Sequence, residues 1–140
     1  MRDPSPRRCH AVYAPSMTGA NFGGMYLDAG EWADLEVLRD FYSGVFGMEV
    51  VSEQADESVW FAMRDMTFGF HVGDPIPREH RWCVNIVLNT AEGVSIDEEA
   101  TRLEAVGCSL MMGPTDMPWG ARVVTLLDPA GYSVWYMQRS

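Results

Sequence analysis

The sequence predicts an α+β protein made of two successive modules of one kind, each ordered as strand, helix and three strands. Apolar residues with helical spacing and with alternating spacing follow one another in this order twice along the 140 residues. The glycines expected to end the two helices, Gly47 and Gly107, lie 60 positions apart, and a strand pattern follows each. Since several elements rarely recur in one order by chance, we expect a duplicated fold in a single domain, residues 20–140.

The first module, residues 20–74, contains a helix that is predicted to begin with Asp34 as its N-cap and to end at Gly47. Its two last strands are expected to meet at a turn near Arg64 and Asp65. The four strands of this module are predicted at residues 21–28, 48–53, 58–65 and 66–73.

The second module, residues 81–138, follows a proline-containing connector, residues 73–81. Its helix is predicted over residues 95–107, with a capping box between Ser95 and Glu98. The four strands are predicted at residues 83–89, 108–112, 121–128 and 132–137. Strand alternation separates the side chains that face a helix from those that face the other side of each sheet.

Composition and charge restrict the possible partners. The net charge is −10, and all ten basic residues are arginine. So acidic a chain is not expected to bind nucleic acid, whereas a cationic small molecule would be attracted. Without lysine, the chain lacks a residue for Schiff-base catalysis. No stretch approaches the ~20 apolar residues of a membrane span, so no membrane partner is expected.

Cysteine usage and the N-terminal residues bear on location. Cys9, Cys83 and Cys108 are widely spaced and odd in number, which favours a reducing, cytoplasmic compartment. Residues 1–19 are rich in proline, serine and charge, and they lack the apolar run of about 7–15 residues that a signal peptide contains. We therefore expect residues 1–19 to form a flexible N-terminal arm.

Two segments carry a resemblance to a known family. FYSGVFGMEV follows most of the first predicted helix, and MPWGARVVTLLDPAGYSVWYM ends the second module. Together with the duplication, they resemble the vicinal oxygen chelate superfamily, which includes glyoxalase I, extradiol dioxygenases and bleomycin-resistance proteins. The resemblance covers about residues 20–138. It implies strongly curved mixed sheets around a cavity, helices outside, and a homodimer with cavities at or near the subunit boundary.

The metal site of that family is expected to be lost. The resemblance implies a divalent ion held by His, Gln or Glu on four strands, with a Glu where this sequence has Trp135. An indole offers no lone pair to a metal. The position that is usually His falls at or beside Cys83 and Asn85, which leaves His71 as the one clear ligand side chain. Since a catalytic metal needs about three protein ligands, we predict no metal and no cofactor.

Under the same resemblance, the side chains directed at the cavity form the candidate ligand site. His71, 64 positions before Trp135, is its expected counterpart in the first module. Structural roles compete with this interpretation: Trp135 as a core plug, His71 as an ordinary strand histidine, and Trp119 as a loop anchor. The side that Trp60 faces stays open, since both faces of its strand are apolar. The candidate residues are Tyr26, Trp60, His71, Asn85, Trp119 and Trp135.

Two functions follow from these observations. The favoured one is a metal-free binding protein that sequesters a hydrophobic or aromatic ligand, with antibiotics among the candidates, because stacking on tryptophan needs area and no reactive group. The alternative is an enzyme of the same fold. It would be a metal-dependent lyase, isomerase or dioxygenase, or a metal-free catalyst with His71 as acid and base.

Overall fold

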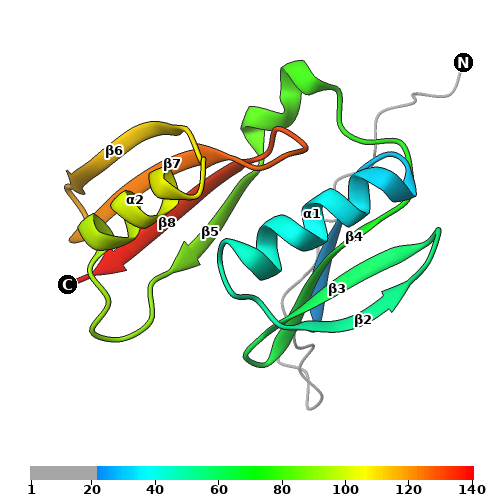
Figure 1. Cartoon of the computed structure of the whole chain (residues 1–140), viewed down its shortest axis with the longest axis horizontal. Coiled ribbons are helices and arrows are strands. Elements are labelled where there is room, and N and C mark those ends of the chain that lie inside the picture. The colour runs from blue at the N-terminus through cyan, green and yellow to red at the C-terminus, as the bar shows by residue number, and fades with distance from the viewer. Residues whose placement is uncertain (1–21) are drawn as a thin grey trace, which may run out of the picture.

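The computed structural model describes residues 22–140 and contains the predicted duplication (Figure 1). The predicted arm, residues 1–19, lies outside the described residues. A short 3₁₀ helix, η1 (Arg78–Cys83), forms part of the connector between the modules. The first module consists of β1 (Gly24–Asp28), α1 (Trp32–Gly44), β2 (Val50–Gln54), β3 (Ser58–Met63) and β4 (Met66–His71). The second consists of β5 (Asn85–Asn89), α2 (Ile96–Ala105), β6 (Leu110–Met117), β7 (Ala121–Leu127) and β8 (Ser133–Arg139).

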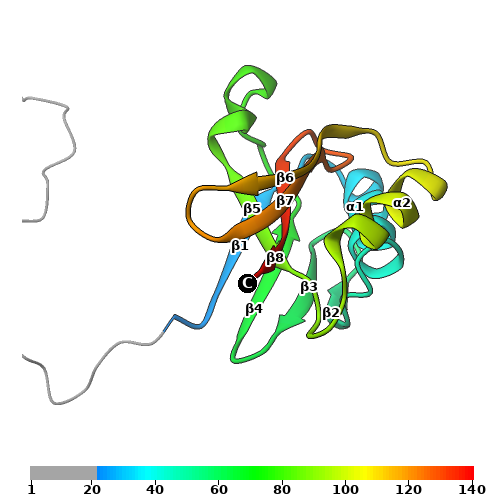
Figure 2. The same cartoon turned by 90° about the vertical axis from the view of Figure 1, so that its left-hand side faces the viewer.

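Each module folds into one mixed four-stranded sheet. The strand orders are β1-β4-β3-β2 and β5-β8-β7-β6, so the same topology occurs twice. The first strand of each module pairs in parallel with the last, and the remaining pairs are antiparallel. Neither sheet closes into a barrel, and both helices lie on the same side of the molecule (Figures 1 and 2). The predicted α+β class and its two βαβββ modules are confirmed.

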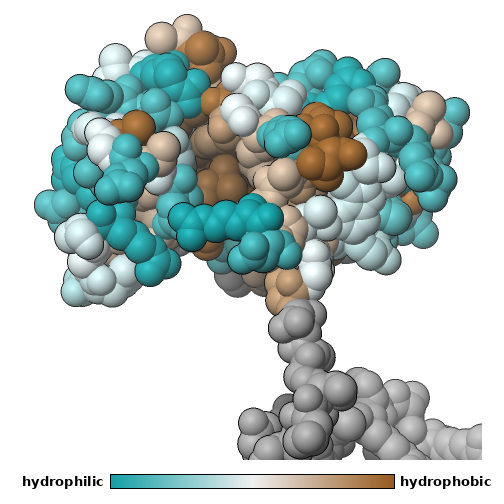
Figure 3. Space-filling model, turned by 90° about the horizontal axis from the view of Figure 1, so that it is seen from below, coloured by the Kyte–Doolittle hydropathy of each residue, from teal (hydrophilic) through white to brown (hydrophobic). Residues whose placement is uncertain are grey.

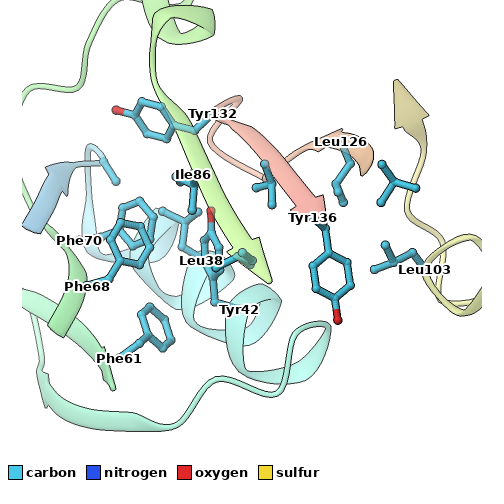
Figure 4. Close-up of a cluster of buried hydrophobic side chains, with 14 of the residues drawn as sticks. Leu38, Tyr42, Phe61, Phe68, Phe70, Ile86, Leu103, Leu126, Tyr132 and Tyr136 are labelled. Carbon is cyan, nitrogen blue, oxygen red and sulfur yellow. The ribbon is translucent and has the colours of Figure 1, made fainter. Parts of the chain in front are cut away.

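A hydrophobic core that spans both modules fills the space between the helices and the sheets (Figure 4). Alternate residues of two strands face this core: Ile86 and Leu88 of β5 and Phe68 and Phe70 of β4 are buried in it. Each such side chain contributes about 1.5–3 kcal/mol by leaving water. The buried residues of the two helices are Leu35, Leu38, Tyr42, Ile96, Ala100 and Leu103.

Buried polar groups also join the two modules. The Tyr42 hydroxyl of α1 donates to Asp128 Oδ2 of the second module at 2.7 Å. Asp128 Oδ1 accepts from the backbone N–H groups of Ala130 and Tyr132, both at 2.9 Å. The Tyr132 hydroxyl donates in return to the Asp28 carbonyl at 3.1 Å. Burial raises the pKa of the Asp128 carboxyl even with these hydrogen bonds. These hydrogen bonds and the shared core cluster thus link the two modules.

The helix starts differ from the sequence prediction. Asp34 is not the N-cap of α1: Glu31 occupies that position, and Asp34, three residues later, accepts from the Glu31 N–H at 3.0 Å. Ser95 is the N-cap residue of α2, but its side chain makes no capping hydrogen bond, so the predicted capping box is absent. Gln138 of β8 supplies the acceptor for the Ile96 N–H at 3.0 Å. A tertiary contact thus replaces a local one.

One strand extends well beyond its predicted end. β6 runs from Leu110 to Met117, whereas the sequence predicts a strand that stops at residue 112. The register with β7 shifts twice along β6, and these irregularities let the strand pass Gly113 and Pro114. Gly and Pro signal a strand end in sequence, and here they mark bulges instead.

Candidate functional site

The face of each sheet that points away from the core carries the predicted site residues; we call these the open faces. Tyr26, Trp60 and His71 lie on the open face of the first sheet and contact one another, and we call them the first ring cluster. Trp135 and Trp119 form the second ring cluster, at the second sheet. Asn85, also predicted, is exposed at the start of β5, the edge strand of the second sheet. Among residues 22–140, no aromatic ring contact joins the two clusters.

The first ring cluster is built on a glycine in the middle of β4. A Cβ on Gly69 would lie 2.8 Å from the Trp60 indole, so the missing side chain makes room for the indole across the sheet. This contact places Trp60 on the open face, which the sequence left undecided. Tyr26 stacks on His71 with ring centroids 4.2 Å apart, and Trp60 meets His71 edge-on at 5.3 Å. Tyr26 is itself 52% exposed.

His71 carries an unusual nitrogen. Its Nε2 is buried and has no hydrogen-bond partner within the described part of the chain. An unpaired buried polar atom costs about 1–3 kcal/mol, whereas an aromatic pair contributes about 0.5–1.5 kcal/mol beyond its burial. The free-energy cost of leaving Nε2 unpaired is therefore at least as large as the stabilisation from the Tyr26–His71 stack. The ring contacts of His71 are the stacked Tyr26 and the edge-on Trp60.

The second ring cluster lies over apolar side chains. Trp135 and Trp119 are nearly parallel, with an interplanar angle of 27° and ring centroids 6.5 Å apart. Trp135 also packs against a small buried group on this face, formed by Ala121, Val123 and Met137. Trp119 is 62% exposed. Trp135 is therefore partly a packing residue and partly a platform for a more exposed ring.

Strand register changes the expected correspondence between His71 and Trp135. Tyr26 pairs with Gly69 in the first sheet, and Val87 pairs with Trp135 at the same point of the second sheet. Counted along the two parallel ladders, Trp135 occupies the place of Gly69, and His71 occupies the place of Met137. Sequence spacing missed this because the loops of the two modules differ in length. Gly69 is also the site residue that sequence reasoning missed, although a glycine inside a strand is a signal of close approach.

A hollow lies between the two modules. Its volume is about 1040 Å³, and it is lined by residues of both modules, including Met48, Met63, Val87 and Tyr136. Figure 3 shows this side of the molecule, with apolar side chains in the recess between the halves. None of the six predicted site residues lines this hollow. The second ring cluster is the nearer one, since Val87, which lines the hollow, pairs with Trp135 across β5 and β8.

Other features of the described chain bear on metal and membrane binding. Across residues 22–140, no three His, Cys, Asp or Glu side chains converge in a way that could hold a metal ion. Cys83 and Cys108 are free thiols, and burial raises the pKa of the Cys108 thiol. No helix in this range is long and apolar enough to cross a membrane.

Known proteins share this architecture. Lactoylglutathione lyase from Agrobacterium tumefaciens is 25% identical, with a TM-score of 0.67 over 86% of this chain and 95% of that chain. TnmS3, an antibiotic-binding protein from Streptomyces sp. CB03234, is 22% identical, with a TM-score of 0.67 over 89% of this chain and all of that chain. A glyoxalase/bleomycin resistance protein/dioxygenase from Nocardioides is 20% identical, with a TM-score of 0.67 over 89% and 86% of the two chains. A comparison with curated proteins gave no match.

A family profile extends the likeness to the sequence itself. The profile of the Glyoxalase/Bleomycin resistance protein/Dioxygenase superfamily matches residues 33–136, from the first turn of α1 to the middle of β8. This range covers α1 from its second residue, all of α2, the strands β2 to β7 and the first half of β8. With the duplicated βαβββ topology, the match confirms the resemblance to the vicinal oxygen chelate fold. The chain therefore belongs to the Glyoxalase/Bleomycin resistance protein/Dioxygenase superfamily.

Proposed function

We propose that this protein binds a small hydrophobic or aromatic molecule without a metal and sequesters it, as a protective binding protein would. The observation that carries the proposal is the second ring cluster: Trp135, at a position where the family pattern has a metal-binding Glu, stacks with the exposed Trp119. Two parallel indoles offer polarizable area for a flat ligand. The likeness to an antibiotic-binding protein supports this function and makes antibiotics candidate ligands.

The ligand we expect is planar and neutral or cationic. The net charge of −10 attracts cations toward the protein. The rings of both clusters present π-faces, on which a cation is also stabilised. Free Cys83 and Cys108 are consistent with a reducing, cytoplasmic location.

We further propose a homodimer in which a second copy helps to enclose the ligand. Tyr26, Val87 and Trp119 leave 52%, 44% and 62% of their surface exposed on open faces that one chain does not cover. Each open sheet also has free edge strands, which favour pairing. Light scattering at micromolar concentration should give a mass near twice 15.7 kDa. A monomeric mass would contradict the dimer.

The binding proposal is tested with ethidium, a planar aromatic cation. Ethidium should quench tryptophan fluorescence saturably and raise the melting temperature. Trp135→Ala should weaken binding by about 1–3 kcal/mol, the range for loss of one aromatic contact. Its cost in folding stability should stay below the ~3–5 kcal/mol of a fully buried Trp, because Trp135 is only partly buried.

Trp32→Phe is the matched control, since Trp32 packs against the main core at the start of α1. It should leave ethidium binding unchanged. If Trp135→Ala unfolds the protein while the residual folded fraction binds ethidium normally, Trp135 is a core residue and the proposal loses its main support.

An enzyme remains the second candidate, on the strength of the 25% identity to a lactoylglutathione lyase and of the imidazole on the open face. In that case His71 would act as acid or base. The test is incubation with lactoylglutathione, with and without added divalent metal. Turnover that His71→Gln abolishes would favour the enzyme over the binding protein.

A further inference from the structure

The hollow between the two modules suits a segment of peptide chain. Its volume of about 1040 Å³ lies just above the roughly 300–1,000 Å³ of small-molecule pockets. Met48, Met63 and Met66 of the first module line it and are half-buried, and we call them the hollow methionines. Methionine side chains adapt to irregular partners. Figure 3 shows apolar side chains in this recess, so an apolar occupant is expected.

One wall of the hollow is the edge of a strand. Val87, Leu88 and Asn89 of β5 are consecutive, and all three line the hollow. Since consecutive strand residues point to opposite faces, the hollow borders the edge of β5 and not one face alone. β5 pairs only with β8, so the backbone groups on its other edge have no strand partner within residues 22–140. An extended peptide can pair with such an edge.

The described residues begin at this hollow. Phe22, the first of them, lines the hollow and is 68% exposed. The residues before it, 9–21, include no Asp, Glu, Lys or Arg, and residues 11–17, AVYAPSM, are mainly apolar. At about 3.3–3.6 Å per extended residue, Met17 can lie no farther than ~18 Å from Phe22. Residues 11–17 are therefore within reach of the hollow.

Charge and connectivity favour the same segment. Residues 1–8 hold three arginines and one aspartate, a net charge of +2, so residues 22–140 carry −12 of the total of −10. The lining itself is neutral, since its two arginines offset its two acidic residues. The overall charge thus attracts the basic end, and apolar contacts select the hollow. A segment joined to its own site by a few residues also binds at an effective concentration of about millimolar order.

We propose that residues 11–17 of the same chain occupy the hollow, along the edge of β5 and against the hollow methionines. The segment covers apolar surface that both modules contribute. This inference concerns a surface other than the two ring clusters, and it does not rest on the proposed ligand function.

The test uses the whole 140-residue chain with ¹³C-methyl methionine and a nitroxide spin label on Cys9. Cys83→Ser and Cys108→Ser leave Cys9 as the one thiol that takes the label. Docking brings the nitroxide to the hollow, so the methyl signals of the hollow methionines should broaden strongly. Met111 of β6, which is 66% exposed and outside the hollow, is the internal control. Equal broadening of Met111 and the hollow methionines would overturn the proposal.

Two variants separate docking from the mere closeness of the segment to Phe22. Val12→Asp and Tyr13→Asp each place a charge in the apolar segment and should lower the docking equilibrium constant about tenfold or more. The broadening at the hollow methionines should then fall. Ser5→Asp adds the same charge outside the segment and should leave the broadening in place. Broadening that persists in both Val12→Asp and Tyr13→Asp would refute docking.

A mixed sample shows whose hollow the segment occupies. Spin-labelled chains without ¹³C are unfolded in urea and refolded together with ¹³C-methyl chains that carry Cys9→Ser and no nitroxide. The hollow methionines of the ¹³C chains should stay sharp, because each hollow is filled by its own chain. Broadening in this sample would place the segment in the hollow of a neighbouring copy and overturn the assignment to the same chain.

Discussion

The two modules pack the shared core with different kinds of side chain. The first module contributes rings, among them Tyr42, Phe61, Phe68 and Phe70, in a chain of edge and tilted contacts. The second contributes mainly aliphatic residues to the same core: Ile96, Leu103, Val124, Leu126 and Val134. Both nevertheless have one strand order. The topology therefore depends on where apolar residues recur, and the identity of each residue is free within wide limits.

The open faces differ more strongly than the cores. On the first sheet, Gly69 leaves space that Trp60 fills, and His71 stacks beneath Tyr26. On the second sheet, Trp135 stands at the equivalent of Gly69 and packs on small apolar side chains. One face thus carries an imidazole and the other only indoles. Since neither face supports the core, each was free to acquire its own chemistry.

The largest effect is expected where the modules share the core. Phe70→Ala should lower the free energy of unfolding by about 3–5 kcal/mol, and Leu126→Ala of the second module by about 2–5 kcal/mol. Both residues are almost fully buried in the same cluster. Urea unfolding followed by tryptophan fluorescence and by circular dichroism should give one coincident transition for each variant.

A single transition in each variant would show that the two modules unfold together as one cooperative unit. Two separate transitions in Phe70→Ala, with the second module still folded, would mean that the modules are independent and that the Tyr42–Asp128 contact between them is weak.

A smaller effect is expected from adding one methyl group to each sheet. In Gly69→Ala the new Cβ would lie 2.5 Å from the Val59 carbonyl oxygen and 2.8 Å from the Trp60 indole. We expect a loss of about 1–3 kcal/mol in stability, together with a shift in tryptophan emission as Trp60 moves. Gly113→Ala in β6 meets nothing within 4 Å and should change stability by less than about 0.5 kcal/mol. If the two substitutions changed stability equally, the contact with the Trp60 indole would not explain why residue 69 is a glycine.

The sequence predicted the elements well because helical and alternating periodicities are local properties. It predicted the core side of β4 and β5 for the same reason. It failed at the starts of both helices. Gln138 acts on α2 from a distant strand, and Asp34 closes a capping box on Glu31, a residue type that N-cap preferences do not favour. It also failed to separate the five candidate rings into two clusters and Asn85 from both, because the distance between two sheets depends on tertiary packing. The unpaired Nε2 of His71 is likewise a property of its neighbours and not of its sequence context.

The smallest effect concerns a tyrosine in the second module at high pH. The Tyr136 hydroxyl donates to Glu99 Oε2 at 3.1 Å, and burial together with this carboxylate raises the pKa of Tyr136 to about 12. An unfolded tyrosine has a pKa of about 10. The contribution of Tyr136 to stability is therefore complete below pH ~10 and is lost as the pH rises through ~12. In the first module, burial also raises the pKa of Tyr42, so both modules lose stability in this range.

Tyr136→Phe removes from the second module the contribution of the Tyr136 hydroxyl to this loss of stability at high pH. Its free energy of unfolding should fall less steeply between pH ~10 and ~12 than that of the wild type, because one fewer hydroxyl must ionise in a buried site. Urea unfolding at closely spaced pH values measures the slopes. If Tyr136→Phe and the wild type lose stability in parallel, the alkaline loss belongs to the other buried tyrosines, Tyr42 of the first module and Tyr132 of the second, since burial raises the pKa of both.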